Sequence, residues 1–320
     1  MSQLEQLKKM TTVVVDTGDI EAIQKYTPTD ATTNPSLIYA AMQKPEYKNL
    51  LDEAYLYSQK AKSPADQMNL FMDKLSVLVG VQILKIIPGR VSTEVPSYLS
   101  FDVEASIQKG KELIALYEGK GVDRKRVLIK LASTWEGGLA AKELEKQGIH
   151  CNMTLMFSLV QAVHCADAQA TLISPFVGRI LDWFKKAEGI SSYAPADDPG
   201  VKSVGSIYHY YKKFGIKTQI MGASFRNKEE ILELAGCDLL TISPQFLGEL
   251  EQSNEKLERK LDPSQSKNTE VSQIMLDEKM FRWMLNQDAM ATEKLSEGIR
   301  NFAKDANKLE DLIRKAYKFG

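Results

Sequence analysis

The sequence predicts an α/β fold in which eight parallel strands close into a (β/α)8 TIM barrel. Eight short apolar runs recur along the chain, and segments with helical periodicity lie between them. No GxGxxG pattern follows the first run, which disfavours the competing open, doubly wound sheet. The 320 residues exceed the roughly 250 typical of such a barrel, so we expect additional helices within one barrel domain spanning residues 1–320.

The predicted strands are short runs in which apolar and β-branched residues predominate. In chain order they are Thr12–Asp16, Thr29–Thr33, Gly89–Val95, Val127–Leu131, Cys151–Leu155, Leu172–Val177, Gln219–Ser224 and Leu239–Ser243. Between several of them, apolar side chains recur every three or four residues, as in amphipathic helices. These predicted helices include Val103–Tyr117, Glu136–Gln147, Ser158–Asp167 and Lys228–Leu234.

Additional helices are predicted in two places. Three follow the second strand, at Leu37–Met42, Tyr47–Gln59 and Ala65–Leu84. Beyond the eighth strand, Ile274–Tyr317 is a predicted helical C-terminal extension that could cover the barrel mouth or mediate association. Two polar segments, Ser191–Gly200 and Glu255–Thr269, are predicted to be a surface loop and a charged connection.

Charge and hydropathy argue against several classes of partner. Lys plus Arg total 41 against 42 Asp plus Glu, and a net charge of -1 gives no overall attraction for nucleic acid or an anionic membrane. The N-terminus has no apolar signal stretch, and no apolar run approaches membrane-spanning length. We therefore expect no nucleic acid partner, no membrane partner and a cytoplasmic location.

Cysteine and histidine placement does not indicate a metal site. The three cysteines, Cys151, Cys165 and Cys237, lack CxxC spacing, which argues against a disulfide framework and fits a reducing compartment. The histidines are too far apart for a HExxH motif, and we expect structural or surface roles for them. They are His150, His164 and His209. No metal is expected.

Lys130 is an isolated cation within the apolar run Val127–Leu131. A strand buried in a parallel sheet would carry this ammonium group into the interior. Burial disfavours the charged form of an amine, and a neutral amine can attack a carbonyl to form a Schiff base. Taken alone, the residue is better explained as a lysine that reaches solvent or pairs with a carboxylate.

Polar residues recur near the carboxyl ends of six other predicted strands. Residues two apart face the same side of a strand, and inward side chains at the carboxyl ends of the strands build the active site of a barrel. The residues at these positions are Asp16, Thr32, Asn34, Ser92, Glu94, Asn152, Thr154, Ser174, Phe176, Ser224 and Arg226. Each polar one alone can be a strand-end or capping residue. Together they favour a site, because a core layer would use Val, Ile and Leu there.

Several segments resemble the transaldolase family. The resemblance rests on Asp30–Leu37 (DATTNPSL), Gly89–Val95 (GRVSTEV) and Ile129–Gly137 (IKLASTWEG). Supporting segments are Val15–Asp19, Cys151–Leu155, Ser174–Arg179 and Met221–Arg226. The matching segments occur in order from the first strand to the last helices, nearly the whole chain, and the longest ones are far more specific than a single short pattern.

The resemblance implies transfer of a three-carbon dihydroxyacetone unit between sugar phosphates, in the non-oxidative pentose phosphate pathway and without a cofactor. Lys130 would form the Schiff base with the ketose carbonyl. Asp16 would accept the proton of the hydroxyl that becomes the aldehyde. Glu94, acting through a water with Thr154 beside it, would move protons while the imine forms.

The same resemblance implies binding roles for other residues. The hydroxyls of the dihydroxyacetone unit would be held by Thr32, Asn34, Asn152 and Ser174, and the phosphate by Arg179, Ser224 and Arg226. Phe176 stands where the related fructose 6-phosphate aldolases carry a tyrosine and release the unit to water. A phenyl ring donates no proton, so transfer is favoured over cleavage. Homodimers are common in the family, and a homodimer is expected.

Two alternative functions stay open at this level. One is a Schiff-base aldolase, of the fructose 6-phosphate type, that releases free dihydroxyacetone or pyruvate. The other is a non-catalytic barrel that binds a sugar phosphate through Arg179 and Arg226, with Lys130 as an ion-pair partner.

Two places depart from the family pattern. Pro96-Ser97-Tyr98 replaces an acidic residue, an alanine and an arginine, and Gly138 replaces a branched aliphatic residue. Pro96 should stiffen the exit from the third strand, and the lost charges could weaken a salt bridge there. Gly138 should cost roughly 1 kcal/mol of helix stability relative to alanine. Activity should survive both changes.

Overall fold

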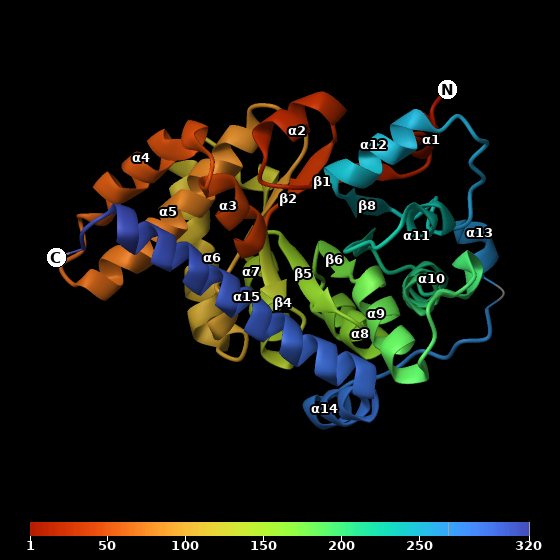
Figure 1. Cartoon of the computed structure of the whole chain (residues 1–320). Coiled ribbons are helices and arrows are strands. Elements are labelled where there is room, and N and C mark those ends of the chain that lie inside the picture. Colours follow the sequence, from red (N-terminus) through yellow and green to blue (C-terminus); the bar gives the residue numbers. More distant parts are fainter. Residues whose placement is uncertain (268, 320) are drawn as a thin grey trace.

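The chain folds into a closed barrel of eight parallel strands surrounded by helices, as seen in a computed structural model that describes residues 1–267 and 269–319 (Figure 1). The strands follow one another around the barrel in chain order, and β8 pairs with β1 to close it. The predicted (β/α)8 barrel is therefore confirmed.

All eight predicted strands are present, with small differences at their ends. They are β1 (Thr12–Asp16), β2 (Asp30–Thr32), β3 (Val91–Glu94), β4 (Val127–Ala132), β5 (Cys151–Met156), β6 (Leu172–Pro175), β7 (Gln219–Gly222) and β8 (Leu239–Ile242). β6 ends earlier than predicted because Val177 already begins the next helix. β7 stops at Gly222, and Ser224 then takes a left-handed backbone conformation with φ 61°.

Helices connect the strands on the outside of the barrel. The four predicted helices are α6 (Val103–Glu118), α7 (Trp135–Lys146), α8 (Leu159–Asp167) and α11 (Lys228–Glu233). Further connections are α2 (Ile20–Tyr26), α9 (Val177–Glu188), α10 (Pro199–Lys213) and α12 (Pro244–Gln252). The predicted loop Ser191–Gly200 is only partly irregular, because it holds a short 3₁₀ turn, η4 (Pro195–Asp197), and the start of α10, which the Asp198 carboxylate caps.

The additional helices lie where they were predicted. α3 (Pro35–Met42), α4 (Lys48–Ser58) and α5 (Pro64–Leu84) separate β2 from β3. The C-terminal extension is two helices, α14 (Glu278–Gln287) and α15 (Ala289–Ala316), joined at Asp288, whose carboxylate caps α15. The shorter helices are α1 (Gln3–Leu7), α13 (Pro263–Ser266), η1 (Pro45–Tyr47), η2 (Ser97–Leu99) and η3 (Arg124–Arg126). α13 lies inside the segment predicted as a charged connection.

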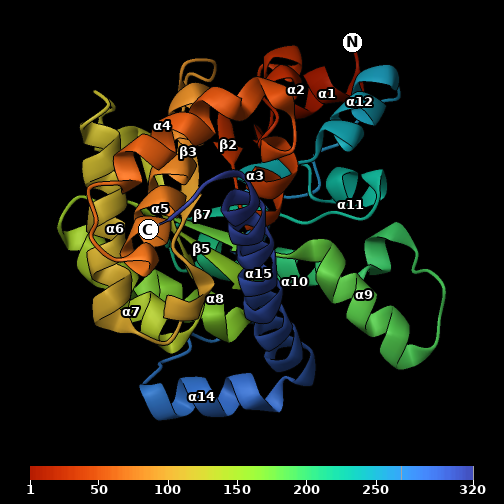
Figure 2. The same ribbon diagram turned by 60° about the vertical axis from the view of Figure 1, so that its left-hand side comes forward.

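α15 lies across one end of the barrel. It contacts α3 on one side and α9 on the other, and it packs against β5 between them. Figure 1 shows α15 in blue running in front of the strands, and Figure 2, seen from another side, shows it standing between α3 and α9 with α14 below. Of the two predicted possibilities for the extension, covering the barrel mouth is the one that these contacts support.

The barrel interior is filled by layers of side chains. One layer is entirely apolar and consists of Val14, Leu128, Leu172, Met221 and Leu239. Two residues further along the strands the side chains point to the same side, because the period of a strand is two. The next layer towards the carboxyl ends therefore contains Asp16, Lys130, Ser174 and Thr241, all of which line a cavity.

Candidate active site

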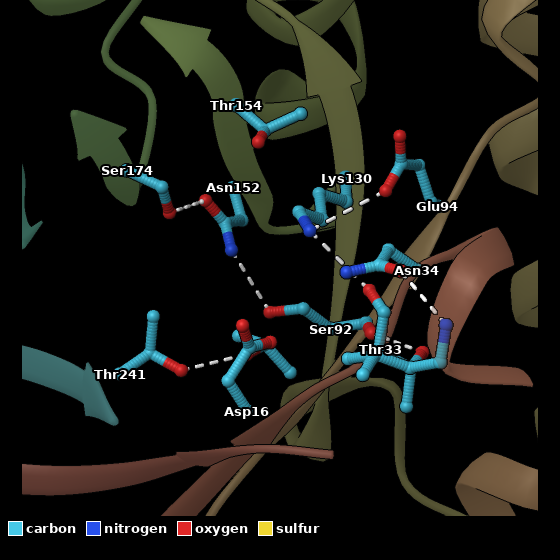
Figure 3. A network of polar contacts seen from close by, with 12 residues as sticks. Asp16, Thr33, Asn34, Ser92, Glu94, Lys130, Asn152, Thr154, Ser174 and Thr241 are labelled. Carbon is cyan, nitrogen blue, oxygen red and sulfur yellow. Dashed lines mark hydrogen bonds and ion pairs between the residues drawn. The ribbon is translucent and has the colours of Figure 1, made fainter. Parts of the chain in front are cut away.

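Lys130 lies near the end of β4 with its amine buried inside the barrel. The residue is 5% exposed, so it does not reach solvent. Its Nζ donates a hydrogen bond to the Thr33 carbonyl at 3.3 Å and lies 3.3 Å from Glu94 Oε2 (Figure 3). The parallel register of β3 and β4 sets Glu94 beside Lys130. The buried amine thus has a carboxylate partner within 3.3 Å.

Glu94 and Asp16 are two buried carboxyl groups on different strands near the same lysine. Burial raises the pKa of Glu94, and the positive charge of Lys130 opposes part of that rise. Burial also raises the pKa of Asp16, while Lys130 and a hydrogen bond from Thr32 Oγ1 at 2.8 Å oppose it. Both groups therefore hold protons more readily than exposed carboxylates.

Three polar side chains form a chain of hydrogen bonds across the barrel. Asn152 Nδ2 donates to Ser92 Oγ at 3.0 Å, and Ser174 Oγ donates to Asn152 Oδ1 at 2.6 Å. On the opposite side, the Thr32 and Thr241 hydroxyls lie 2.7 Å apart. Figure 3 shows Ser92, Asn152, Ser174 and Thr241 around the space next to Lys130. The layer is held together by hydrogen bonds rather than by apolar packing.

The Thr154 hydroxyl belongs to the cavity wall. Its Oγ1 is buried and has no hydrogen-bond partner among the described residues. A buried hydroxyl without a partner costs free energy, typically 1–3 kcal/mol, and such groups usually await a water or a ligand. A register irregularity in β5 between Met153 and Met156, with Leu155 at φ 53°, accompanies this position.

A small cavity of about 50 Å³ opens between these side chains. Nine of the twelve residues predicted for the site line it: Asp16, Thr32, Asn34, Lys130, Thr154, Ser174, Phe176, Arg179 and Ser224. Glu94 and Asn152 do not line the cavity. They contact two residues that do, Lys130 and Ser174 respectively. Asn34 also caps α3, since its Oδ1 accepts a hydrogen bond from the Leu37 amide at 3.0 Å.

The remaining predicted residue, Arg226, lies at the rim. Its side chain is exposed and pairs with Asp182 at 2.8 Å. Gly178 allows this segment to approach α9, because a Cβ at Gly178 would lie 2.5 Å from both Arg226 Cγ and the Ser224 carbonyl oxygen. The close approach places Arg226 beside the start of α9, which carries Arg179.

Arg179 is held between two aromatic rings. Its guanidinium lies 4.8 Å from the centre of the Phe176 ring and 5.5 Å from that of Phe302. Burial lowers the pKa of Arg179, and the nearby charge of Arg226 lowers it further. Two neighbouring cations at the cavity mouth favour an anionic ligand there.

Four residues of the cavity wall were not predicted as site residues: Met221, Ala223, Thr241 and Phe302. Thr241 lies within the predicted eighth strand, two residues after Leu239, so the same two-residue spacing could have identified it. Phe302 comes from α15, and no local pattern in the sequence connects that helix to the barrel mouth. Ser92 had the right spacing but no predicted role, and it supports Asn152.

The structure explains why a glycine occupies position 138. The His164 ring stacks on Trp135, with ring centres 4.2 Å apart and an interplanar angle of 13°. A Cβ at Gly138 would lie 2.1 Å from His164 Nε2, so any other residue would collide with this ring. Gly138, on the helix that directly follows the Lys130 strand, therefore makes room for His164 on α8.

Metal sites and membrane spans are absent from the described part of the chain. In residues 1–267 and 269–319, no group of three or more His, Cys, Asp and Glu side chains is arranged to hold a metal ion. Within the same residues, no helix combines the length and hydropathy needed to cross a bilayer.

The fold and the site define the chain as a (β/α)8 barrel with a lysine and two carboxyl groups at the carboxyl ends of its strands. Residues 13–313 match the transaldolase/fructose-6-phosphate aldolase family, to which the chain therefore belongs. A transaldolase of Protochlamydia amoebophila is 70% identical over 319 residues, covering 100% of this chain and 99% of the relative. The human transaldolase is 59% identical over 98% of this chain and 93% of its own length.

A cyanobacterial relative extends the comparison. The transaldolase of Thermosynechococcus vestitus is 56% identical over 98% of this chain and 82% of its own length. Such identity over the full length supports transaldolase activity for this chain.

Proposed function

We propose that Lys130 is the residue through which this transaldolase carries its three-carbon unit, as a Schiff base with the ketose carbonyl. The observation that carries the proposal is the burial of its amine beside Glu94 at the carboxyl end of β4. The donor is sedoheptulose 7-phosphate or fructose 6-phosphate, and the acceptor is glyceraldehyde 3-phosphate or erythrose 4-phosphate. The amine attacks the carbonyl carbon, and loss of water from the carbinolamine gives the imine.

The two carboxyl groups take opposed proton-transfer duties. Asp16 removes the proton from the hydroxyl that becomes the aldehyde, and the protonated imine accepts the electron pair of the broken carbon–carbon bond. Glu94 serves imine formation by moving protons to and from the departing water, with the unpartnered Thr154 hydroxyl positioned to bind that water. Separate positions on β1 and β3 let one lysine serve both steps.

The polar ring around Lys130 binds the hydroxyls of the dihydroxyacetone unit. Thr32, Asn34, Asn152 and Ser174 are the proposed contacts. Hydrogen bonds between Ser174 and Asn152, between Thr32 and Thr241, and from the Leu37 amide to Asn34 hold them in place before substrate arrives. Arg179, Arg226 and Ser224 bind the phosphate at the cavity mouth. A phosphate would neutralise the repulsion between the two arginines, which is the physical reason for this assignment.

Phe176 favours transfer over cleavage. Its ring lies against Phe157 and under Arg179, inside a cluster of apolar side chains. The phenyl ring itself carries no hydroxyl that could help water release the three-carbon unit, so the intermediate waits for an aldehyde acceptor. Phe176→Tyr should raise the ratio of free dihydroxyacetone to transferred product. An unchanged ratio would contradict this role of Phe176.

Borohydride trapping tests the role of Lys130 directly. The enzyme is incubated with fructose 6-phosphate, reduced and digested, and the adduct is located by mass spectrometry. An adduct on Lys130 is expected, while an adduct elsewhere or none would refute the proposed role of Lys130. Adding erythrose 4-phosphate and measuring sedoheptulose 7-phosphate then separates transfer from aldol cleavage.

The remaining proposals concern the whole molecule. We propose a single domain over residues 1–320, a cytoplasmic location, a homodimer, and activity without a cofactor or metal. Large apolar side chains on α14, Met280 and Trp283, are exposed and support an interface between copies. Light scattering should give twice the monomer mass of 35.9 kDa. Dialysis against EDTA should leave activity unchanged.

A further inference from the structure

A second pair of buried carboxyl groups lies directly behind the rim of the proposed phosphate site. Glu230 on α11 is 1% exposed, and Asp198 at the start of α10 is 4% exposed. Both belong to the wall of a cavity of about 220 Å³, separate from the cavity around Lys130. No step of the proposed reaction uses either residue.

Glu230 holds the backbone of the phosphate-binding segment. Its Oε2 accepts a hydrogen bond of 2.6 Å from the Arg226 amide. The next residue, Asn227, caps α11, which begins at Lys228. A shift of the Glu230 carboxyl group would therefore release the amide of the residue that carries one of the two arginines.

The environment of the second Glu230 oxygen, Oε1, favours a proton bound between Glu230 and a neighbouring acid. Oε1 is buried and meets no hydrogen-bond donor among the described residues. The neighbouring group is the Asp198 carboxyl, whose Oδ1 already accepts hydrogen bonds from the Gly200 and Val201 amides. Two carboxylates cannot hydrogen-bond to each other, but a carboxylic acid and a carboxylate can. One shared proton satisfies the buried oxygen and removes the repulsion between the two groups.

We propose that Asp198 and Glu230 share a proton, and that this proton lets Glu230 act as a positioning residue for Arg226. When the proton leaves through the adjoining cavity to solvent, two negative charges face each other and the carboxyl groups separate. The Arg226 amide then loses its acceptor, and the phosphate site loosens. Phosphate affinity is thereby coupled to pH, an inference that rests on the proposed role of Arg226.

The electrostatic surroundings agree with this arrangement. Burial and the charge of Asp198 raise the pKa of Glu230 to about 7, and burial raises the pKa of Asp198 as well. Other charged or titratable groups also face the pair, each from a different neighbouring element: α9, the loop before η4, α11 and the rim, in this order. They are Lys185, Tyr193, Glu229 and Arg226, and Asp182 pairs with Arg226. Because the proton is bound more tightly in the folded state, the pair is intact below pH 7 and lost as pH rises.

The test is the pH dependence of two measurements, the KM for fructose 6-phosphate and the inhibition constant of inorganic phosphate. Between pH 6 and 8.5 both should rise roughly fivefold in the unaltered enzyme, with little change in kcat. Glu230→Gln should keep the low-pH values at both pH values, since its amide can donate to Asp198 without titrating. Glu251→Gln, the same change at an exposed position on α12 outside this cavity, should behave like the unaltered enzyme.

A spectroscopic measurement makes the test independent of kinetics. Infrared difference spectra should show a protonated carboxyl band that disappears as pH rises through about 7. The band should be absent from Glu230→Gln and from Asp198→Asn, the second variant from the other side of the pair. A Glu230→Gln enzyme that keeps the normal pH dependence and the band would overturn the shared proton.

The role of Arg226 is tested separately. Arg226→Lys should raise the KM for fructose 6-phosphate at both pH values, because it removes the planar pair of donors. If it does not, the phosphate role fails, whatever the behaviour of Glu230→Gln. Ionisation of the substrate phosphate near pH 6 affects all variants alike, and the comparison between them removes it.

Discussion

Two layers inside the same barrel differ completely in chemistry although they share strands and geometry. The lower layer is Val14, Leu128, Leu172, Met221 and Leu239. The upper layer, two residues later on the same strands, includes Asp16, Lys130, Ser174 and Thr241. Most side chains in both layers are buried, but the upper layer lines a cavity. The difference teaches that side-chain choice alone makes one layer a core and the next a reaction site.

The two layers are held together by different forces. The lower layer is stabilised by apolar burial, at about 25 cal/mol per Å² removed from water. In the upper layer each polar group needs a hydrogen bond or an ion pair, because an unpaired one costs about 1–3 kcal/mol. Changes in the upper layer should therefore alter rates more than stability, and changes in the lower layer should do the reverse.

The largest effect is expected at Lys130. Lys130→Met keeps the side-chain volume but removes the amine, so no imine can form, and kcat should fall roughly 10⁴-fold or more. The measurement is the coupled transfer assay, with borohydride trapping as a second readout. Lys142→Met, at an exposed position on α7, is the matched control and should keep full activity. A loss of less than tenfold in Lys130→Met would contradict the assignment.

Glu94 should have the next largest effect. Glu94→Gln removes a proton-transfer group without changing its shape, and kcat should fall roughly 10²- to 10³-fold. Because the pKa of Glu94 is raised above its usual 4.5, the activity limb that reports its ionisation should lie above pH 4.5 in the unaltered enzyme. The limb should be missing from the pH profile of the variant. A profile that keeps it would assign the limb to another group.

The lower layer gives the opposite pattern. Leu128→Ala leaves a cavity two residues before Lys130 and should reduce the free energy of unfolding by about 2–5 kcal/mol. Denaturant unfolding measures the loss. kcat measured well below the unfolding temperature should change less than threefold, roughly the scatter of such measurements. A kcat loss as large as that of Glu94→Gln would show that the two layers are not separate in function.

The smallest expected effect is on stability, at Gly138, and a second substitution at His164 provides its control. Gly138→Ala should destabilise the protein by about 1–3 kcal/mol, since the added methyl group meets the His164 ring. In a His164→Ala background the same change should instead stabilise by about 1 kcal/mol, the helix propensity of alanine over glycine. Thermal unfolding of the four proteins gives this double-mutant cycle. Additive effects would mean that the predicted collision is relieved elsewhere.

Much of the site could be predicted because strands impose a period of two. Thr32, Asn152 and Ser174 follow this period on their own strands, and the barrel then brings their ends together. Phe302 could not be predicted in this way, because α15 is far away in sequence and only packing places it over the mouth. From the sequence, Gly138 only lowers the stability of its helix. The structure shows that a larger residue there would collide with the His164 ring.

By itself, the sequence determined the eight strands, the extra helices and the chemistry available at each strand end. These features depend on local patterns of apolar and polar residues, and such patterns are readable without a structure. The tertiary structure alone decided which groups meet: Glu94 beside Lys130, Phe302 against Arg179, and Asp198 beside Glu230. Each pair joins residues on different elements, and only the packing of these elements against one another sets the distances between them.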